Sequence, residues 1–211
     1  MNTLIERKLQ QYPSSILTEG ELACLAGGTP HSRYARNKRA VQKGDLIRIK
    51  RGLYVVNKQL SQQAPSFFEL AQRIYGPSYI SFESALSYHG LIPEAVYSIT
   101  SATTKRTKIF ETPLGHFSYI SLPNFNFFIG VAHIKEGNQH YLLASPWKAL
   151  LDYIYCYTKK YRTVTEAAED LRLDVSELPK IAAKDLEAFE LYYQNTRINQ
   201  FIKGISEEYL Q

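Results

Sequence analysis

The chain has 211 residues, of which 45% are hydrophobic and 21% charged, as in ordinary soluble globular proteins. Its formal net charge of +5 is uneven, because residues 1–60 hold eleven Lys or Arg against four acids and residues 61–211 hold fourteen against sixteen. This separation predicts a polyanionic partner for the N-terminal part alone. No uninterrupted apolar run reaches about 18 residues, which argues against a membrane span.

Cys24 and Cys156 lie far apart within apolar helical patterns. We therefore expect two buried free thiols, which suit a reducing cytoplasm. The chain begins M-N-T-L-I-E-R-K-L, without a long apolar run, so no signal peptide is expected. The expected location is the cytoplasm, with no membrane partner.

Two helices are expected before residue 29. The first is marked by apolar residues at helical spacing that precede Pro13, namely Leu4, Ile5, Leu9 and Tyr12. Thr18 and Glu21 then form a capping-box pattern, which predicts the start of the second helix. Gly27 and Gly28 end that helix and supply a turn.

A third helix is expected from Thr29, an N-cap that Pro30 follows at the first helical position. At about 100° per residue, Tyr34 and Val41 fall on the side expected to face the core. The opposite side carries a hydrogen-bonding stripe with two flanking cations: Ser32, Arg36, Arg39 and Lys43, with Arg33 and Lys38 beside them. An apolar back and a basic front are typical of a recognition helix in the major groove of DNA.

Residues 44–56 predict a basic β-hairpin after this helix. Ile47 and Ile49 alternate with cations as in a strand with one buried face, and residues 53–56 return after a turn. The cations of this hairpin are Arg48, Lys50 and Arg51. Three helices and a hairpin predict a winged helix-turn-helix domain over residues 1–60, whose wing contacts phosphate or the minor groove.

A solvated basic surface is the alternative interpretation of this stretch, since most charged helix faces serve only solubility. Between Arg33 and Arg51, however, eight basic residues accompany a single acid, Asp45. The scarcity of acids for intrahelical pairing favours DNA binding.

Residues 66–211 predict a second, α+β domain after a short polar linker at residues 61–65. Helices are expected near residues 67–75 and 81–89, strands over residues 97–143, and helices from Ser145 onward. The expected strand segments include H-F-S-Y-I-S-L at residues 116–122 and F-N-F-F-I-G-V at residues 125–131. Lys148 and Asp152 stand four residues apart, where they can pair on the helix surface.

Signatures of catalysis are missing from the sequence. It has no G-x-S-x-G elbow, no glycine-rich phosphate loop and no metal-ligand spacing among its five histidines and two cysteines. We therefore expect a binding protein rather than an enzyme, without metal or cofactor.

Three segments in order resemble the AbiEi family, abortive-infection antitoxins of type IV toxin–antitoxin systems. They are the basic R-N-K-R-A-V-Q-K-G-D-L-I-R-I-K-R-G-L-Y-V, then Y-I-S-F-E-S-A-L-S-Y-H-G-L-I, then A-S-P-W-K-A-L-L-D-Y-I. The similarity spans nearly the whole chain. The resemblance implies an N-terminal winged helix and a C-terminal antitoxin domain.

The same resemblance implies a bacterial autorepressor that binds repeats in its own promoter. It also implies that the C-terminal domain counters a nucleotidyltransferase-like toxin without requiring a tight complex. Its antitoxin-motif candidates in this chain are Ser81, Glu83, Ser84, His89, Lys148 and Asp152. Three tyrosines between residues 153 and 157 depart from the family pattern and predict either a partner surface or a half-buried helix.

A different class of function stays open on the sequence alone. The chain fits a solitary winged-helix regulator whose C-terminal domain binds a small ligand or another protein. An enzyme acting on nucleic acid is disfavoured, because it needs an acidic metal site that the sequence does not offer.

Overall fold

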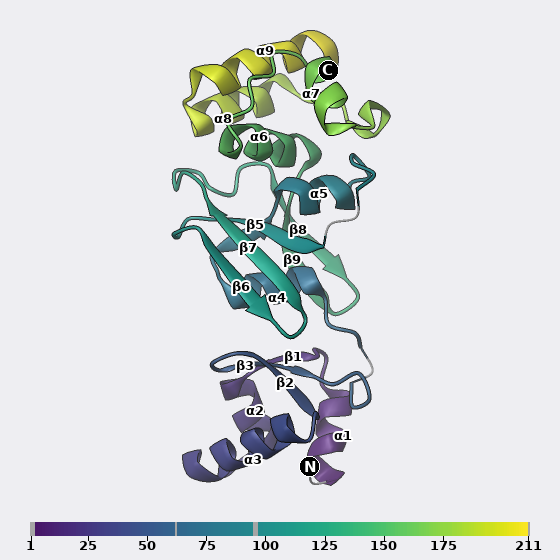
Figure 1. Ribbon diagram of the computed structural model, residues 1–211, viewed down its shortest axis with the longest axis vertical. Coiled ribbons are helices and arrows are strands. Elements are labelled where there is room, and N and C mark those ends of the chain that lie inside the picture. The colour runs from purple at the N-terminus through teal and green to yellow at the C-terminus, as the bar shows by residue number, and fades with distance from the viewer. Residues whose placement is uncertain (1–2, 62, 95–96, 211) are drawn as a thin grey trace.

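The computed structural model describes residues 3–61, 63–94 and 97–210. The two ends of the chain lie at opposite ends of the molecule (Figure 1). A small sheet with three helices occupies the N-terminal end, a larger sheet the middle, and a group of helices the C-terminal end (Figure 1). The molecule is thus a mixed α and β protein, as expected.

The N-terminal end alternates helices and strands in a fixed order. The elements are α1 (Thr3–Gln11), β1 (Ile16–Thr18), α2 (Glu19–Ala26), α3 (Pro30–Gln42), β2 (Leu46–Lys50) and β3 (Leu53–Val56). The antiparallel sheet has the order β1-β3-β2. The three helices and the hairpin match the sequence prediction, whereas the short strand β1 was missed.

Local signals explain where these helices begin and end. The Thr18 hydroxyl accepts a hydrogen bond from the Glu21 amide at 3.2 Å, and the Glu21 carboxylate accepts one from the Thr18 amide at 2.6 Å. This reciprocal arrangement is the predicted capping box. Gly27 and Gly28, with φ of 60° and 92°, then adopt backbone conformations that other residues rarely reach.

The small sheet buries both of its faces. Leu17, Leu46 and Val56 pack in one apolar cluster with α1, α2 and α3. On the other face, Ile16, Ile49 and Val55 join the large core of the rest of the molecule. The predicted linker at residues 61–65 therefore joins two parts that share an apolar interface.

The larger sheet is mixed and has the order β6-β7-β5-β4-β9-β8. Its strands are β4 (Ser78–Ile80), β5 (Ser98–Thr103), β6 (Lys108–Thr112), β7 (Gly115–Ser121), β8 (Val131–Glu136) and β9 (Gln139–Ala144). The strand expected over residues 125–131 was wrong, because residues 125–130 form a turn whose Phe127 packs on Tyr79. Apolar composition alone does not distinguish such a buried turn from a strand.

Helices cover this sheet, and further helices form the C-terminal end of the molecule. They are α4 (Phe67–Ile74), α5 (Phe82–Tyr88), α6 (Pro146–Cys156), α7 (Val164–Leu171), a short 3₁₀ turn η1 (Val175–Glu177), α8 (Ala183–Tyr193) and α9 (Thr196–Tyr209). Leu70, Ala71 and Ile74 place the apolar side of α4 in the core. The apolar side of α6 lies in the same core and carries Trp147, Leu150 and Ile154.

The cysteines differ from expectation. Both are free, but Cys24 is exposed and only Cys156 is partly buried. Cys24 lies on the outer side of α2, where Leu22 alone is fully buried. A short helix with apolar residues on every side gives no periodicity from which to predict the buried face.

Candidate nucleic-acid interface

Helix α3 begins as the sequence predicts. The Thr29 hydroxyl accepts a hydrogen bond from the Ser32 amide at 3.3 Å, and Pro30 occupies the first turn. The Ser32 hydroxyl donates in turn to the Thr29 carbonyl at 2.9 Å. These local bonds fix the start of the helix, with Thr29 as the N-cap, and bind the Ser32 hydroxyl to the backbone of its own helix.

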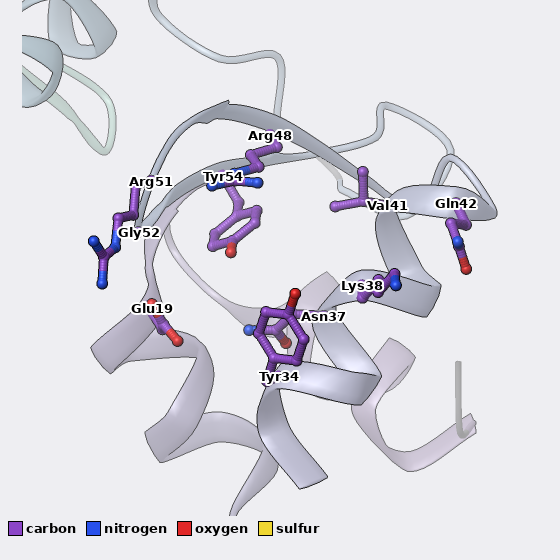
Figure 2. Close-up of a pocket in the computed structure, with 10 residues that line it drawn as sticks. All are labelled: Glu19, Tyr34, Asn37, Lys38, Val41, Gln42, Arg48, Arg51, Gly52 and Tyr54. Atoms are coloured by element: carbon purple, nitrogen blue, oxygen red, sulfur yellow. The ribbon is translucent and has the colours of Figure 1, made fainter. Parts of the chain in front are cut away.

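The buried side of α3 consists of Asn37 and Ala40. Tyr34, which was expected in the core, is 65% exposed, and Val41 is only partly buried. The side chain of Ala40 is short enough for α3 to pack closely, whereas the Tyr34 ring lies outside, toward the hairpin (Figure 2). The prediction was wrong because it assigned the largest apolar side chain to the core.

Because Asn37 and Ala40 face the core instead of Tyr34 and Val41, the side chains of α3 that face outward differ from those predicted. Ser32, Arg39 and Lys43 are exposed, but their stripe lies about a quarter turn from the buried pair rather than opposite it. Lys38, predicted only as a flanking residue, is exposed as well and lies as far from the buried side as Arg39 does. Arg33 is partly buried. The outward basic residues of α3 are therefore Lys38, Arg39 and Lys43.

Arg36 has a structural partner that the sequence prediction did not include. Its guanidinium donates to the carbonyls of Ala26 at 3.3 Å and Gly27 at 3.0 Å, at the end of α2. Cations at a helix C-terminus satisfy carbonyls that lack intrahelical donors. Arg36 thus holds the turn between α2 and α3.

A groove of about 380 Å³ separates α3 from the β2–β3 hairpin (Figure 2). On the helix side it is lined by Tyr34 and Lys38, and on the hairpin side by Arg48 and Arg51. The remaining lining residues are Glu19, Asn37, Val41, Gln42, Gly52 and Tyr54. Three cations with one acid leave this groove with a net positive charge.

The Tyr54 hydroxyl lies among these charges. Burial raises the pKa of Tyr54, as does the Glu19 carboxylate, while the Arg48 guanidinium acts in the opposite direction. Tyr54 therefore stays a neutral hydrogen-bond donor at physiological pH. Neither tyrosine was predicted to line a groove: Tyr34 was expected in the core, and Tyr54 was predicted only as part of the returning strand.

Lys50 does not share the orientation of Arg48, contrary to the predicted wing. A β-bulge between these two residues shifts the pairing with β3. Such a bulge re-aims the following side chain. The Lys50 ammonium instead donates to the Ile74 carbonyl at the end of α4. Only Arg48 and Arg51 of the predicted wing cations face the groove.

In the C-terminal part, Lys148 and Asp152 form an ion pair of 2.7 Å in which both side chains are 0% exposed. The prediction of a surface pair was therefore wrong, because α8 and β4 cover this side of α6. Asp152 accepts further hydrogen bonds from Tyr193 at 2.6 Å, Ser81 at 2.7 Å and Tyr79 at 2.9 Å. These donors join β4, α6 and α8 at one carboxylate.

Aromatic rings enclose the ammonium of this pair. The Lys148 nitrogen lies 3.8 Å from the ring centre of Tyr192 and 4.7 Å from that of Tyr193. Burial lowers the pKa of Lys148, and Asp152 opposes that shift. Burial and the nearby carboxylate raise the pKa of Tyr79 and of Tyr193. The contacts favour a structural role for the pair.

The other antitoxin-motif candidates are also engaged in the fold. Ser84 accepts from the Thr100 amide at 2.8 Å, and His89 contacts the Ala144 carbonyl at 2.8 Å. Ser81 has turned its hydroxyl toward Asp152 and makes no side-chain cap. Glu83 differs, because it lines a groove of about 680 Å³ with residues of α5, β5 and α7.

The three tyrosines near the end of α6 are mostly half-buried. Tyr153 and Tyr155 are partly buried, and Tyr157 is 40% exposed. Tyr155 packs on Tyr193 with ring centres 5.4 Å apart. Tyr157 packs on Phe82 of α5 and on Tyr153, so Tyr155 belongs to the contact between α6 and α8 and Tyr157 to that between α6 and α5.

Within residues 3–61, 63–94 and 97–210, no group of three His, Cys, Asp or Glu side chains is placed to hold a metal ion. None of the helices in the described part of the chain combines the length and apolar character needed to cross a bilayer. Neither a family model nor a curated protein sequence matches this chain.

Proposed function

We propose that the chain is a transcription repressor that binds double-stranded DNA through a winged helix-turn-helix formed by residues 1–60. One observation carries the proposal: Lys38 and Arg39 point outward from α3 beside a groove whose far wall presents Arg48 and Arg51. A helix of this width fits the major groove of B-DNA, and a neighbouring hairpin reaches the adjacent backbone.

The cations divide by role in this proposal. Lys38 and Arg39 on α3, with Lys43 at its C-cap, would contact base edges, which give sequence specificity. Arg48 and Arg51 on the hairpin are placed to contact phosphates, which give affinity and salt dependence. Arg36 acts indirectly, because its guanidinium fixes the approach of α3 to α2.

Gel-shift titrations of the full chain with DNA from upstream of its gene test this division. We expect Arg39→Ala to weaken binding to that DNA by about 1–3 kcal/mol and to relax its preference over an unrelated duplex. We expect Arg48→Ala to weaken binding to both duplexes by the same factor. It should also reduce the slope of log affinity against log salt by about 1.

The matched control is Lys203→Ala, which removes one exposed cation from α9, at the far end of the molecule (Figure 1). It should leave DNA binding unchanged. If Arg39→Ala and Arg48→Ala both bind as the unmodified chain does, the proposed interface is wrong.

We further propose that the chain is a type IV antitoxin that opposes a nucleotidyltransferase-like toxin, without needing a tight complex. The support is the resemblance of its three segments to the AbiEi family. A toxin-type reading frame next to the gene is the first observation to seek. Coexpression of that toxin with an Arg39→Ala/Arg48→Ala full chain then separates the two activities, since the variant should lose repression and retain protection.

A ligand-responsive regulator without a toxin is the second candidate. It is favoured by the groove of about 680 Å³ beside α5, whose walls combine Leu86 and Ile92 with Glu83. Grooves with apolar walls and a few polar groups are typical of small-molecule sites. Two observations would favour this function. No toxin gene would lie next to this gene, and an added metabolite would change the affinity for the operator.

A further inference from the structure

A second basic surface lies beside the wing, on the part of the molecule that carries the larger sheet. The turn between β5 and β6 contributes Lys105, Arg106 and Lys108, all exposed. Lys50 lies close to this turn, because its ammonium and that of Lys105 donate to carbonyls only two residues apart, those of Ile74 and Gly76. Burial and then the charges of Lys105 and Lys108 lower the pKa of Lys50. Cations from two distant segments therefore gather at one place.

Two of these lysines have a partner within the fold. The ammonium of Lys50 donates to the Ile74 carbonyl and that of Lys105 to the Gly76 carbonyl, both at the C-terminal end of α4. A helix C-terminus carries only about half a negative charge. It offsets at most about half of the charge of one lysine and leaves the surface positive.

The other two cations are Arg106 and Lys108. Arg106 and Lys108 form no ion pair among the described residues, and the Lys108 ammonium lies 4.7 Å from the ring centre of Phe110. The cluster continues into the wing, because Lys50 immediately precedes Arg51 in the chain. The cations of the β5–β6 turn and Lys50 therefore lie next to the hairpin that carries Arg51.

We propose that the β5–β6 turn is a second DNA-contacting surface, which binds the phosphate backbone next to the segment held by the wing. This inference rests on the proposed DNA-binding function and extends it beyond residues 1–60. The C-terminal part of the chain then contributes affinity but no sequence preference, because lysine and arginine on phosphates carry no base information. The bulge in β2 serves this surface by turning Lys50 toward the turn.

The test is an Arg106→Ala/Lys108→Ala double variant of the full chain. Both side chains are exposed and form no ion pair within the described part of the chain, so the thermal unfolding curve should match that of the unmodified chain. Binding is titrated over a range of salt on two 30-base-pair duplexes, one from upstream of the gene and one unrelated. We expect weaker binding to both by the same factor, with a salt slope shallower by about 2.

A Lys160→Ala/Lys203→Ala variant removes two exposed cations far from the wing and controls for net charge. A double variant that binds both duplexes like this control overturns the second surface, even while Arg39→Ala still weakens upstream binding. Loss of preference for the upstream duplex in the double variant also overturns it, since that outcome assigns base contacts to the turn. If the unmodified chain binds neither duplex, the proposed function and this inference fail together.

Discussion

The Lys148 ammonium lies 2.7 Å from the Asp152 carboxylate, and neither side chain is exposed. Three hydroxyl groups complete the environment of the carboxylate, and two tyrosine rings lie against the ammonium. A buried ion pair is sensitive to the loss of one partner, because the remaining charge has no water to solvate it. This pair therefore fixes the packing of α6 against α8 and β4.

Lys148→Met should lower the free energy of unfolding by about 3–5 kcal/mol, because it leaves Asp152 buried without a cation. A Lys148→Met/Asp152→Leu double variant should lose less than the sum of the two single losses, since it leaves no unpaired charge. Denaturant unfolding measures all three. Additive losses would show that the two charges are not coupled. Lys159→Ala is the matched control, because the ion pair of Lys159 with Asp170 is exposed. Its loss should leave the free energy of unfolding nearly unchanged.

Glu21 should stabilise the protein only above acidic pH. Burial acts to raise the pKa of Glu21, but hydrogen bonds from Thr18 and the charge of Arg73 lower it overall below 4.5. A carboxylate with a lowered folded-state pKa contributes stability above its unfolded pKa and loses it as pH falls through the folded pKa. Glu21→Gln should therefore cost about 1 kcal/mol at pH 7, and the difference should shrink as pH falls below 4.5. A difference that is constant with pH would contradict this role.

Arg36→Ala and Arg39→Ala should separate fold from recognition. Arg36→Ala removes the donor to two carbonyls of α2, so it should lower stability by about 1–3 kcal/mol as well as weaken DNA binding. Arg39→Ala loses only an exposed bond to its own helix, so its unfolding curve should be unchanged while DNA binding weakens. Equal stability of the two variants in thermal unfolding would remove the structural role of Arg36.

Tyr34→Ala should change stability by no more than about 0.5 kcal/mol, since the side chain is 65% exposed. A core tyrosine would instead cost about 3–5 kcal/mol, as other buried aromatic residues do. The same substitution should weaken DNA binding, because the ring lines the groove between α3 and the hairpin. Chemical unfolding measures the change in stability, and gel shifts measure the change in DNA affinity. Together they distinguish an exposed Tyr34 from a buried one.

The two cysteines should differ in their rate of reaction with a thiol reagent. Burial raises the pKa of Cys156 to about 12, so its thiolate is scarce at neutral pH, whereas Cys24 is exposed. We expect one fast and one slow reaction under native conditions. Cys24→Ser should remove the fast phase; a fast phase that survives would place the reactive thiol at Cys156.

Much of the local structure follows from the sequence alone. Thr18 with Glu21, Thr29 with Pro30 and the glycines at 27 and 28 set the ends of α2 and α3, because each signal acts on backbone groups within four residues. The basic character of residues 33–51 is likewise visible without coordinates.

What only the tertiary structure decided depends on contacts between distant segments. Lys148 is buried because residues 192 and 193 cover it. Arg36 donates to carbonyls at the end of α2 instead of pointing into solvent. A bulge in β2 turns Lys50 toward α4. Spacing along a helix or strand gives the direction of a side chain, but not what lies there. The sequence by itself thus determined that this chain carries a basic helix and hairpin, and the packing determined which of their cations remain exposed.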